Sequence, residues 1–293
     1  MFAHQVIEDC QKEIKSGVTP DYEREANKAI SLIRKSAKFH MGDLDNVFDV
    51  FKGKNTADCF SRDTKYMKLP YLTTWFDYTH KRIFPGDAPN TKEGVLIQTT
   101  GGQQWTVYTA TYHQVSKKWL LYPHKCKIDI AEGGSMVTPN FFLGGKANKD
   151  LEARFLKEFA WVVVLIDYSV RLLNCKNIFA EKIPAPEALN KKRRRAGKQE
   201  LFDYHVLNVV VPPKKRGYHV STEPLSHNRV HLCRGHFKEY TAEHPLFGHY
   251  TGLFWWQPHV RGQNKDGIVM KDYNIHRKGW REPRVCWERG TNG

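Results

Sequence analysis

The amino-acid sequence predicts an α+β protein, and three observations indicate this class. Two segments with helical spacing of apolar residues open the chain, at 2–16 and 21–38. Short segments rich in β-branched and aromatic residues follow between 71 and 131, and a long apolar segment occupies 151–174. Strands that follow one another without intervening helices are typical of antiparallel sheets in α+β folds. We therefore expect N-terminal helices, an antiparallel sheet with a central buried helix, and a basic C-terminal β region.

Each N-terminal segment places its apolar side chains on one face of a helix. In the second segment, Ala26, Ile30 and Ile33 recur at intervals of four and three residues, as a period of 3.6 requires. Asp21 precedes this series and is expected to cap the helix. A third, shorter helix is expected at 46–51. These helices are expected to cover one face of the sheet.

Five segments in the middle of the chain are expected to form an antiparallel β-meander. Glycine, proline or lysine clusters separate them, and they lie at 71–78, 94–100, 104–114, 118–124 and 126–131. The segment at 151–174 is apolar on most sides, and we expect a helix buried against the meander. Residues 162–164 are all valine, but the flanking periodicity favours a helix. The carboxylates of the first half, Asp77 among them, are expected to be solvated or to cap helices.

The chain becomes strongly basic after this helix. Two prolines, Pro184 and Pro186, end the helical segment, and five consecutive cations follow at Lys191, Lys192, Arg193, Arg194 and Arg195. Because so many adjacent charges cannot be buried, this run predicts a loop, either a solvated linker or a loop that contacts phosphates.

Three further strands are expected beyond the basic run, at 202–211, 229–237 and 252–260. The predicted organisation is a helical and antiparallel-sheet domain, a basic linker, and a basic β region rich in His, Arg and Trp. Their boundaries are 1–180, 181–200 and 201–293.

Charge indicates a polyanionic partner. The chain has 46 Lys and Arg against 31 Asp and Glu, a net charge of +15. The last 104 residues hold 20 of these cations against 9 acidic residues, together with 9 of the 14 histidines and 4 of the 8 tryptophans. Cations neutralise phosphates and aromatic rings stack on bases. RNA or the ribosome is therefore the expected partner, and duplex DNA is ranked last because the basic third lacks a helix-turn-helix.

Composition also predicts the compartment. No apolar stretch is long enough to span a membrane, and the N-terminal residues do not form a secretory signal. The six cysteines are widely spaced and form no C-x-x-C pair, so we expect free thiols. We expect a cytoplasmic protein with no membrane partner. The sequence leaves the oligomeric state open.

Two C-terminal segments, 229–240 and 254–262, concentrate the residues most able to carry chemistry. Side chains alternate along an extended strand, so Arg229, His231 and Cys233 share one face. Gly235 indicates a bulge or a close backbone approach. The polar residues are expected to converge across two paired strands; they are Arg229, His231, Arg234, His236, His259 and Arg261.

Three uses of this cluster compete. His231, Cys233, His236 and His259 offer zinc ligands, but their spacing matches no zinc finger, and we expect no metal or cofactor. His231 and His236 are alternatively the base and acid of a metal-independent endoribonuclease, with an arginine or lysine stabilising the transition state. The third use is recognition, in which Arg and His bind phosphates or carboxylates. We favour a binding protein and leave the ribonuclease open.

The same residues resemble a signature of bacteriophage and prophage proteins. Its pattern, R-x-H-[LI]-x-R-G-H-[WF] followed by a strand with W-x-P, is similar to that of the type V-A anti-CRISPR family. The match covers 229–262, with support from the basic run and strand at 189–211, and leaves the tail at 263–293 unmatched. The signature residues are His231, Arg234, Gly235, His236, Trp256, Pro258 and His259 together with Arg229.

The resemblance implies a phage-encoded inhibitor that evades a host defence during translation. Such a protein binds a target peptide or nascent chain of a bacterial defence protein, and RNA or the ribosome, in the cytoplasm of the bacterial host. It silences expression of the defence gene. The cations expected to bind nucleic acid are Lys191, Lys192, Arg193, Arg194, Arg195, Arg229, Arg234 and Arg261.

Overall fold

The computed structural model describes residues 1–44, 64–80, 91–100, 103–131, 134–141, 149–213, 231–233 and 235–261. The α-helices in these ranges are α1 (Ala3–Lys15), α2 (Pro20–Lys35), α4 (Lys149–Leu173) and α5 (Glu187–Arg195), and a short 3-10 helix, η2, spans Thr64–Tyr66. The strands are β1 (Ala37–Asp43), β2 (Thr73–His80), β3 (Thr91–Thr99), β4 (Gln104–His113), β5 (Lys118–Ala131), β6 (Gly134–Phe141), β7 (Ile178–Ile183), β8 (Tyr204–Val209), β9 (His231–Cys233), β10 (His236–Tyr240), β11 (Gly252–Trp256) and β12 (His259–Arg261). The predicted α+β class is confirmed.

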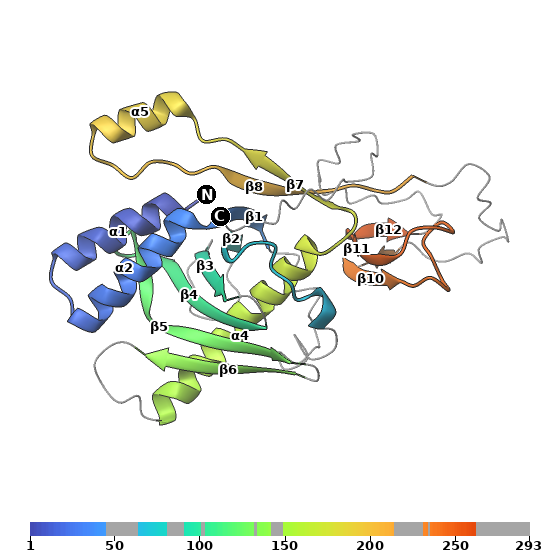
Figure 1. The fold of residues 1–293 in the computed structure, drawn as a ribbon, viewed down its shortest axis with the longest axis horizontal. Helices are drawn as coiled ribbons and strands as arrows, with labels where there is room; N and C mark the ends of the chain where they lie inside the picture. The colour runs from blue at the N-terminus through green and yellow to red at the C-terminus, as the bar shows by residue number, and fades with distance from the viewer. Residues whose placement is uncertain are drawn as a thin grey trace.

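Eight strands form one sheet in the order β6-β5-β4-β3-β2-β1-β8-β7 (Figure 1). Strands β2 to β6 are the predicted antiparallel meander. β1 lies parallel to both β2 and β8, so the sheet is mixed and not purely antiparallel. Parallel neighbours need a long connection, and residues 44–72 separate β1 from β2.

Helices cover both faces of this sheet. Because side chains alternate along a strand, β3 contributes Leu96 to the core beneath α1 and α2, and Val95 and Ile97 to the core beneath α4. The N-terminal helices therefore cover one face, as predicted, and the predicted buried helix covers the other. None of the helices in the described ranges has the length and apolarity needed to cross a membrane.

The boundaries of α2 differ from the predicted ones. Thr19, not Asp21, is the N-cap, and its hydroxyl accepts a hydrogen bond from the backbone N–H of Tyr22 at 3.4 Å. Pro20 takes the first helical position, where its missing N–H costs nothing. The helix ends at Lys35 because Ser36 has extended backbone angles and leads directly into β1, a strand absent from the prediction. The predicted short helix at 46–51 lies outside the described residues.

The two predicted segments at 118–124 and 126–131 form one continuous strand, β5. Its pairing with β4 shifts register between Tyr108 and Ala110, where residues 122–124 stand opposite a single residue. A bulge of this kind accommodates Pro123, which has no N–H to donate to the ladder. Strands β6 and β7 were not predicted.

The predicted basic linker is neither a loop nor a separator between domains. Its five cations lie in α5, at the tip of an excursion between β7 and β8. β7 pairs antiparallel with β8, and β8 pairs with β1. The predicted boundaries at 180 and 201 therefore fall within one sheet.

A buried carboxylate organises the start of the chain. Asp77 is fully buried and accepts hydrogen bonds from the backbone N–H of Phe2 at 3.0 Å and from Trp75 Nε1 at 3.3 Å. Its other oxygen is 2.5 Å from Nδ1 of His40. The expectation that Asp77 is solvated is therefore wrong. Its alternative, a role at a helix end, agrees with the hydrogen bond from Phe2, which holds the N-terminus of α1. Gly94 stands opposite it in the ladder.

Acid is expected to weaken the fold through His4 of α1. Burial, with the nearby Arg193 charge, lowers the pKa of His4 from 6.5 to about 4. In the unfolded chain His4 is protonated below about pH 6.5, whereas in the native protein it stays neutral until the pH approaches 4. The contribution of neutral His4 to stability is therefore fully present above pH 6.5 and is lost as the pH falls to about 4. Allowing for partial solvent screening, we expect a loss of about 2 kcal/mol.

Urea unfolding of wild type and His4→Gln at several pH values across this window measures the effect. The variant should lose less stability on acidification than wild type. Parallel pH profiles for the two proteins would contradict the assignment.

Candidate functional site

The two signature segments pair with each other, as predicted. β10 pairs antiparallel with β11, placing His236 opposite Trp256, and β9 pairs with β12, placing Cys233 opposite His259 and His231 opposite Arg261. Each segment was predicted as one strand but forms two. The breaks fall near Gly235 on one side and Pro258 on the other, where proline lacks a donor for the ladder.

Gly235 makes the close approach that the sequence indicated. It is buried, and the Cβ of an alanine there would lie 2.8 Å from Cζ2 of Trp255 and 3.0 Å from Cδ of Pro258. Real Cβ atoms do not pack at the shorter distance. The glycine therefore allows the backbone to lie directly against the Trp255 ring.

One face of the β10–β11 hairpin is fixed to the body of the protein. Phe237 and Trp255 make edge contacts with Tyr168 of α4, with ring centroids 5.8 and 5.5 Å away. Asn177 accepts from the Trp255 backbone N–H at 2.8 Å and donates to the Trp255 carbonyl at 2.7 Å. These contacts hold the signature hairpin against the body of the protein, which favours a precisely positioned binding surface beside it.

The hairpin borders a groove of about 460 Å³, which Asn177 and Trp255 also line. His236, Lys238 and Tyr240 alternate along β10 and so face it together. Signature residues complete that side; they are Trp256, Pro258 and His259. The far side consists of apolar residues at the end of β8 and in the turn before β11. Four of the predicted signature residues therefore line one groove.

The groove is electrostatically suited to an anion. The described residues that line it include one lysine and two histidines and no carboxylate. Lys238 Nζ lies 4.8 Å from the centre of the Tyr240 ring, which leaves the charge next to an aromatic surface. Glu239, the acidic residue of β10, pairs instead with Lys65, and this hydrogen bond lowers the pKa of Glu239.

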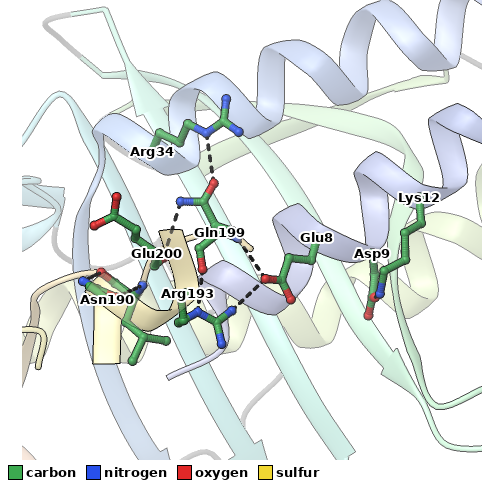
Figure 2. Close-up of polar contacts among 9 residues, drawn as sticks. Glu8, Asp9, Lys12, Arg34, Asn190, Arg193, Gln199 and Glu200 are labelled. Carbon is green, nitrogen blue, oxygen red and sulfur yellow. Dashed lines mark hydrogen bonds and ion pairs between the residues drawn. The ribbon is translucent and has the colours of Figure 1, made fainter. Parts of the chain in front are cut away.

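The second basic element is α5, which is bound to α1 through Arg193, while the turn after it is bound to α2 through Gln199 (Figure 2). Arg193 donates to Glu8 of α1 at 2.7 Å and to the Gln199 carbonyl at 2.7 Å. Gln199 also accepts from Arg34 of α2 at 3.3 Å. Asn190 donates to and accepts from the backbone of Leu201, which closes the turn after the helix.

The predicted loop is a helix because its residues favour one. Alanine, leucine, lysine and arginine have high helix propensity. Glu187 lies in the first turn and the cations in the last, which matches the helix dipole. Arg194 donates to Glu187 at 2.8 Å and to Glu200 at 2.7 Å, and these pairs brace both ends.

Two of the five predicted cations of this run are therefore engaged within the protein. Arg193 and Arg194 hold carboxylates, whereas Lys191, Lys192 and Arg195 are exposed. Lys198, just after the helix, is also exposed. The outer side of α5 thus presents a compact basic surface, which we call the α5 arm: Lys191, Lys192, Arg195 and Lys198.

The structure does not bring all the predicted site residues together. Arg229 and Arg234 lie outside the described residues, and only the backbone of His231 and Arg261 is described. His236 is exposed in β10, whereas His231 belongs to the other ladder. Across the described part of the chain, no three His, Cys, Asp or Glu side chains are grouped to hold a metal ion. Cys10, Cys126, Cys175 and Cys233 are free thiols.

Sequence reasoning missed Lys238, Tyr240 and the role of Asn177. The first two had a usable signal, because residues 236, 238 and 240 alternate on one strand beside the predicted His236. Asn177 had none, since its partner Trp255 is distant in sequence.

Comparison of the chain with protein-family models, with curated proteins and with solved structures gives no match. The resemblance of the signature to the anti-CRISPR family therefore stays a prediction.

Proposed function

We propose that this protein is a phage-encoded regulator that binds RNA, free or on the ribosome, through the α5 arm. The observation that carries the proposal is the arrangement of charge on α5. Arg193 fastens the helix to Glu8 of α1, Arg194 pairs with Glu187 and Glu200 at the two ends of the helix, and the remaining cations face solvent. A helix held in this way presents cations to phosphates without first having to be ordered.

The second part of the proposal concerns what is silenced. On the resemblance of the signature, the protein binds a peptide or nascent chain of a bacterial defence protein, and so acts during translation of that gene. Binding RNA or the ribosome would raise the local concentration of the regulator near emerging chains. The mounting of the signature hairpin on the body supports a binding surface that is positioned before its ligand arrives.

Removal of the exposed charges of α5 is expected to weaken RNA binding and its salt dependence. Each phosphate contact contributes about 0.7 to the slope of log affinity against log salt for a single strand. The variant Lys191→Ala/Lys192→Ala/Arg195→Ala should therefore lower the slope by about 2. Fluorescence anisotropy with a labelled transcript, between about 50 and 200 mM salt, measures both quantities.

A matched control separates the arm from overall charge. Lys15→Ala/Lys28→Ala/Lys118→Ala removes the same number of exposed cations from α1, α2 and β5. This control should keep the wild-type slope. Equal losses in the two triple variants, or RNA binding that does not respond to salt, would reject the α5 arm as the RNA-binding surface.

The same transcript distinguishes binding from cleavage. If the protein is a regulator, the RNA remains intact with and without EDTA. Cleavage that persists in EDTA and is lost in His236→Ala would replace this proposal by a metal-independent ribonuclease using His231 and His236. A preference for duplex DNA over single strands would indicate a DNA-binding regulator instead.

A further inference from the structure

The groove beside β10 has a chemistry that the α5 arm lacks. It combines aromatic side chains, Trp256 and Tyr240, with the cation Lys238 and the imidazole of His236 at exposed positions. Proteins that bind single-stranded nucleic acids pair stacking aromatic rings with cations in this way. The absence of carboxylates from the described lining removes the main source of repulsion for a phosphate.

Trp256 adds a more specific observation. Its indole nitrogen is buried and has no hydrogen-bond partner among the described residues. A buried N–H without an acceptor costs about 1 to 3 kcal/mol, so a bound group that offers an acceptor gains that energy back. Nucleobases carry carbonyl and ring-nitrogen acceptors on their edges.

The size of the groove limits what enters it. A volume of about 460 Å³ is within the range of sites for small organic ligands. A base in a duplex is stacked and paired, whereas an unpaired base can leave the strand and stack on an aromatic side chain. The groove thus fits a nucleotide of a single strand and not a duplex.

The fold connects this groove to the α5 arm. β8 follows α5 in the chain (Figure 1). Val209 at the end of β8 lines the groove, as does Val211 just beyond. The six residues of β8 alone span about 20 Å, and residues 196–203 separate α5 from β8, so an RNA must extend over more than this length to contact both places. A short RNA segment is long enough to contact both places.

From these observations we infer that the groove along β10 is a binding site for an unpaired nucleotide of RNA. The base stacks on Trp256 or Tyr240, and the phosphate lies near Lys238 and His236. This inference rests on the proposed RNA-binding function and specifies the class of RNA: single-stranded, or with an unpaired base. The α5 arm supplies charge, and the groove selects against duplex.

Binding of a fluorescein-labelled RNA of about 12 nucleotides, single-stranded or annealed to its complement, tests the inference. Trp256→Ala should weaken single-strand binding by about 10- to 100-fold and leave duplex binding unchanged. Lys238→Ala, an exposed change that leaves the hairpin core intact, should also weaken it. Lys127→Ala, which removes an exposed lysine from strand β5, is the matched control and should have no effect. Trp256→Phe should bind with an affinity between those of wild type and Trp256→Ala, since a stacking ring remains but the indole N–H is lost.

Crosslinking provides a readout that does not depend on folded variants. Wild-type protein irradiated with the same strand carrying 4-thiouridine should yield crosslinked peptides from 236–261. Crosslinks confined to α5, with groove variants binding normally, would overturn the nucleotide site while preserving the proposed function. If the α5 variant and the groove variants all bind RNA like wild type, both the proposed function of the α5 arm and the nucleotide site are rejected. Binding of an acidic peptide in the groove, with no RNA bound there, would identify a peptide site and also overturn the inference.

Discussion

Replacement of Gly94 by alanine is expected to destabilise the protein by about 3 kcal/mol, the upper end for overpacking a core. The new Cβ would lie 2.2 Å from Cη2 and 2.3 Å from Cζ2 of Trp75. The Trp75 ring is almost fully buried beneath α1 and α2, so it has no free space into which to move. Only glycine at position 94 of β3 leaves room for the Trp75 ring.

Urea unfolding measures the loss as a lower midpoint at unchanged slope. Gly17→Ala is a useful comparison, because Gly17 has a φ of +95° with no atom within 4 Å of its Cβ position, and costs only backbone strain of about 1 kcal/mol. Trp75→Phe removes both contacting carbons, so alanine at 94 should cost less in that background. If Gly94→Ala costs no more than Gly17→Ala, the packing argument is wrong.

Asp77→Ala is expected to cost a similar amount, about 3 kcal/mol, because hydrogen bonds to a charged acceptor are strong and their loss leaves buried donors unpaired. The carboxylate joins three elements: the Phe2 N–H at the start of α1, the Trp75 indole in β2 and His40 in β1. Asp77→Asn should cost less, about 1 kcal/mol, since its oxygen can still accept from Phe2 and Trp75.

Hydrogen exchange distinguishes this role from a general loss of stability. In Asp77→Ala the amides of the first turn of α1 should exchange faster than those of α4, because only the former depend on the carboxylate. Asp129→Ala serves as the control, since Asp129 bonds to Gln104 in an exposed position. Similar stability of Asp77→Ala and Asp129→Ala would contradict the role assigned to Asp77.

Asp77 and Gly94 also show why sequence reasoning underestimates some residues. A single aspartate in a strand-like segment has the same appearance whether it is solvated or buried. Its importance arises from partners at positions 2, 40 and 75, and no local pattern links these. Gly94 likewise has no turn signal around it; its reason is the ring of a residue on the neighbouring strand.

The helices and the meander were predictable because their signals are local. Apolar spacing identified α1, α2 and α4, and β-branched and aromatic runs identified β2 to β5. The prediction failed for β1, whose alternate residues Lys38 and His40 are polar and whose neighbours are parallel strands from remote segments. It also failed for α5, where charge was weighed above helix propensity.

The candidate site was predictable in part. The signature residues and the pairing of their two segments follow from the sequence, and Gly235 carried its own signal of close approach. The sequence did not show which of the five cations of α5 form ion pairs and which stay exposed, because Arg193 pairs with Glu8 of α1 and Arg194 with Glu200 across a turn. Their pairing leaves Lys191, Lys192 and Arg195 for a ligand.

The sequence by itself determined the α+β class, the two opening helices, the buried helix and the C-terminal pairing, because periodicity and turn residues act over short distances along the chain. Only the tertiary structure decided which charges remain exposed, that the sheet is mixed, and that the signature lines a groove at the end of β8. These features depend on contacts between residues far apart in sequence, such as Asn177 with Trp255 and Glu8 with Arg193. Burial and ion pairing are properties of those contacts, and no single segment carries them.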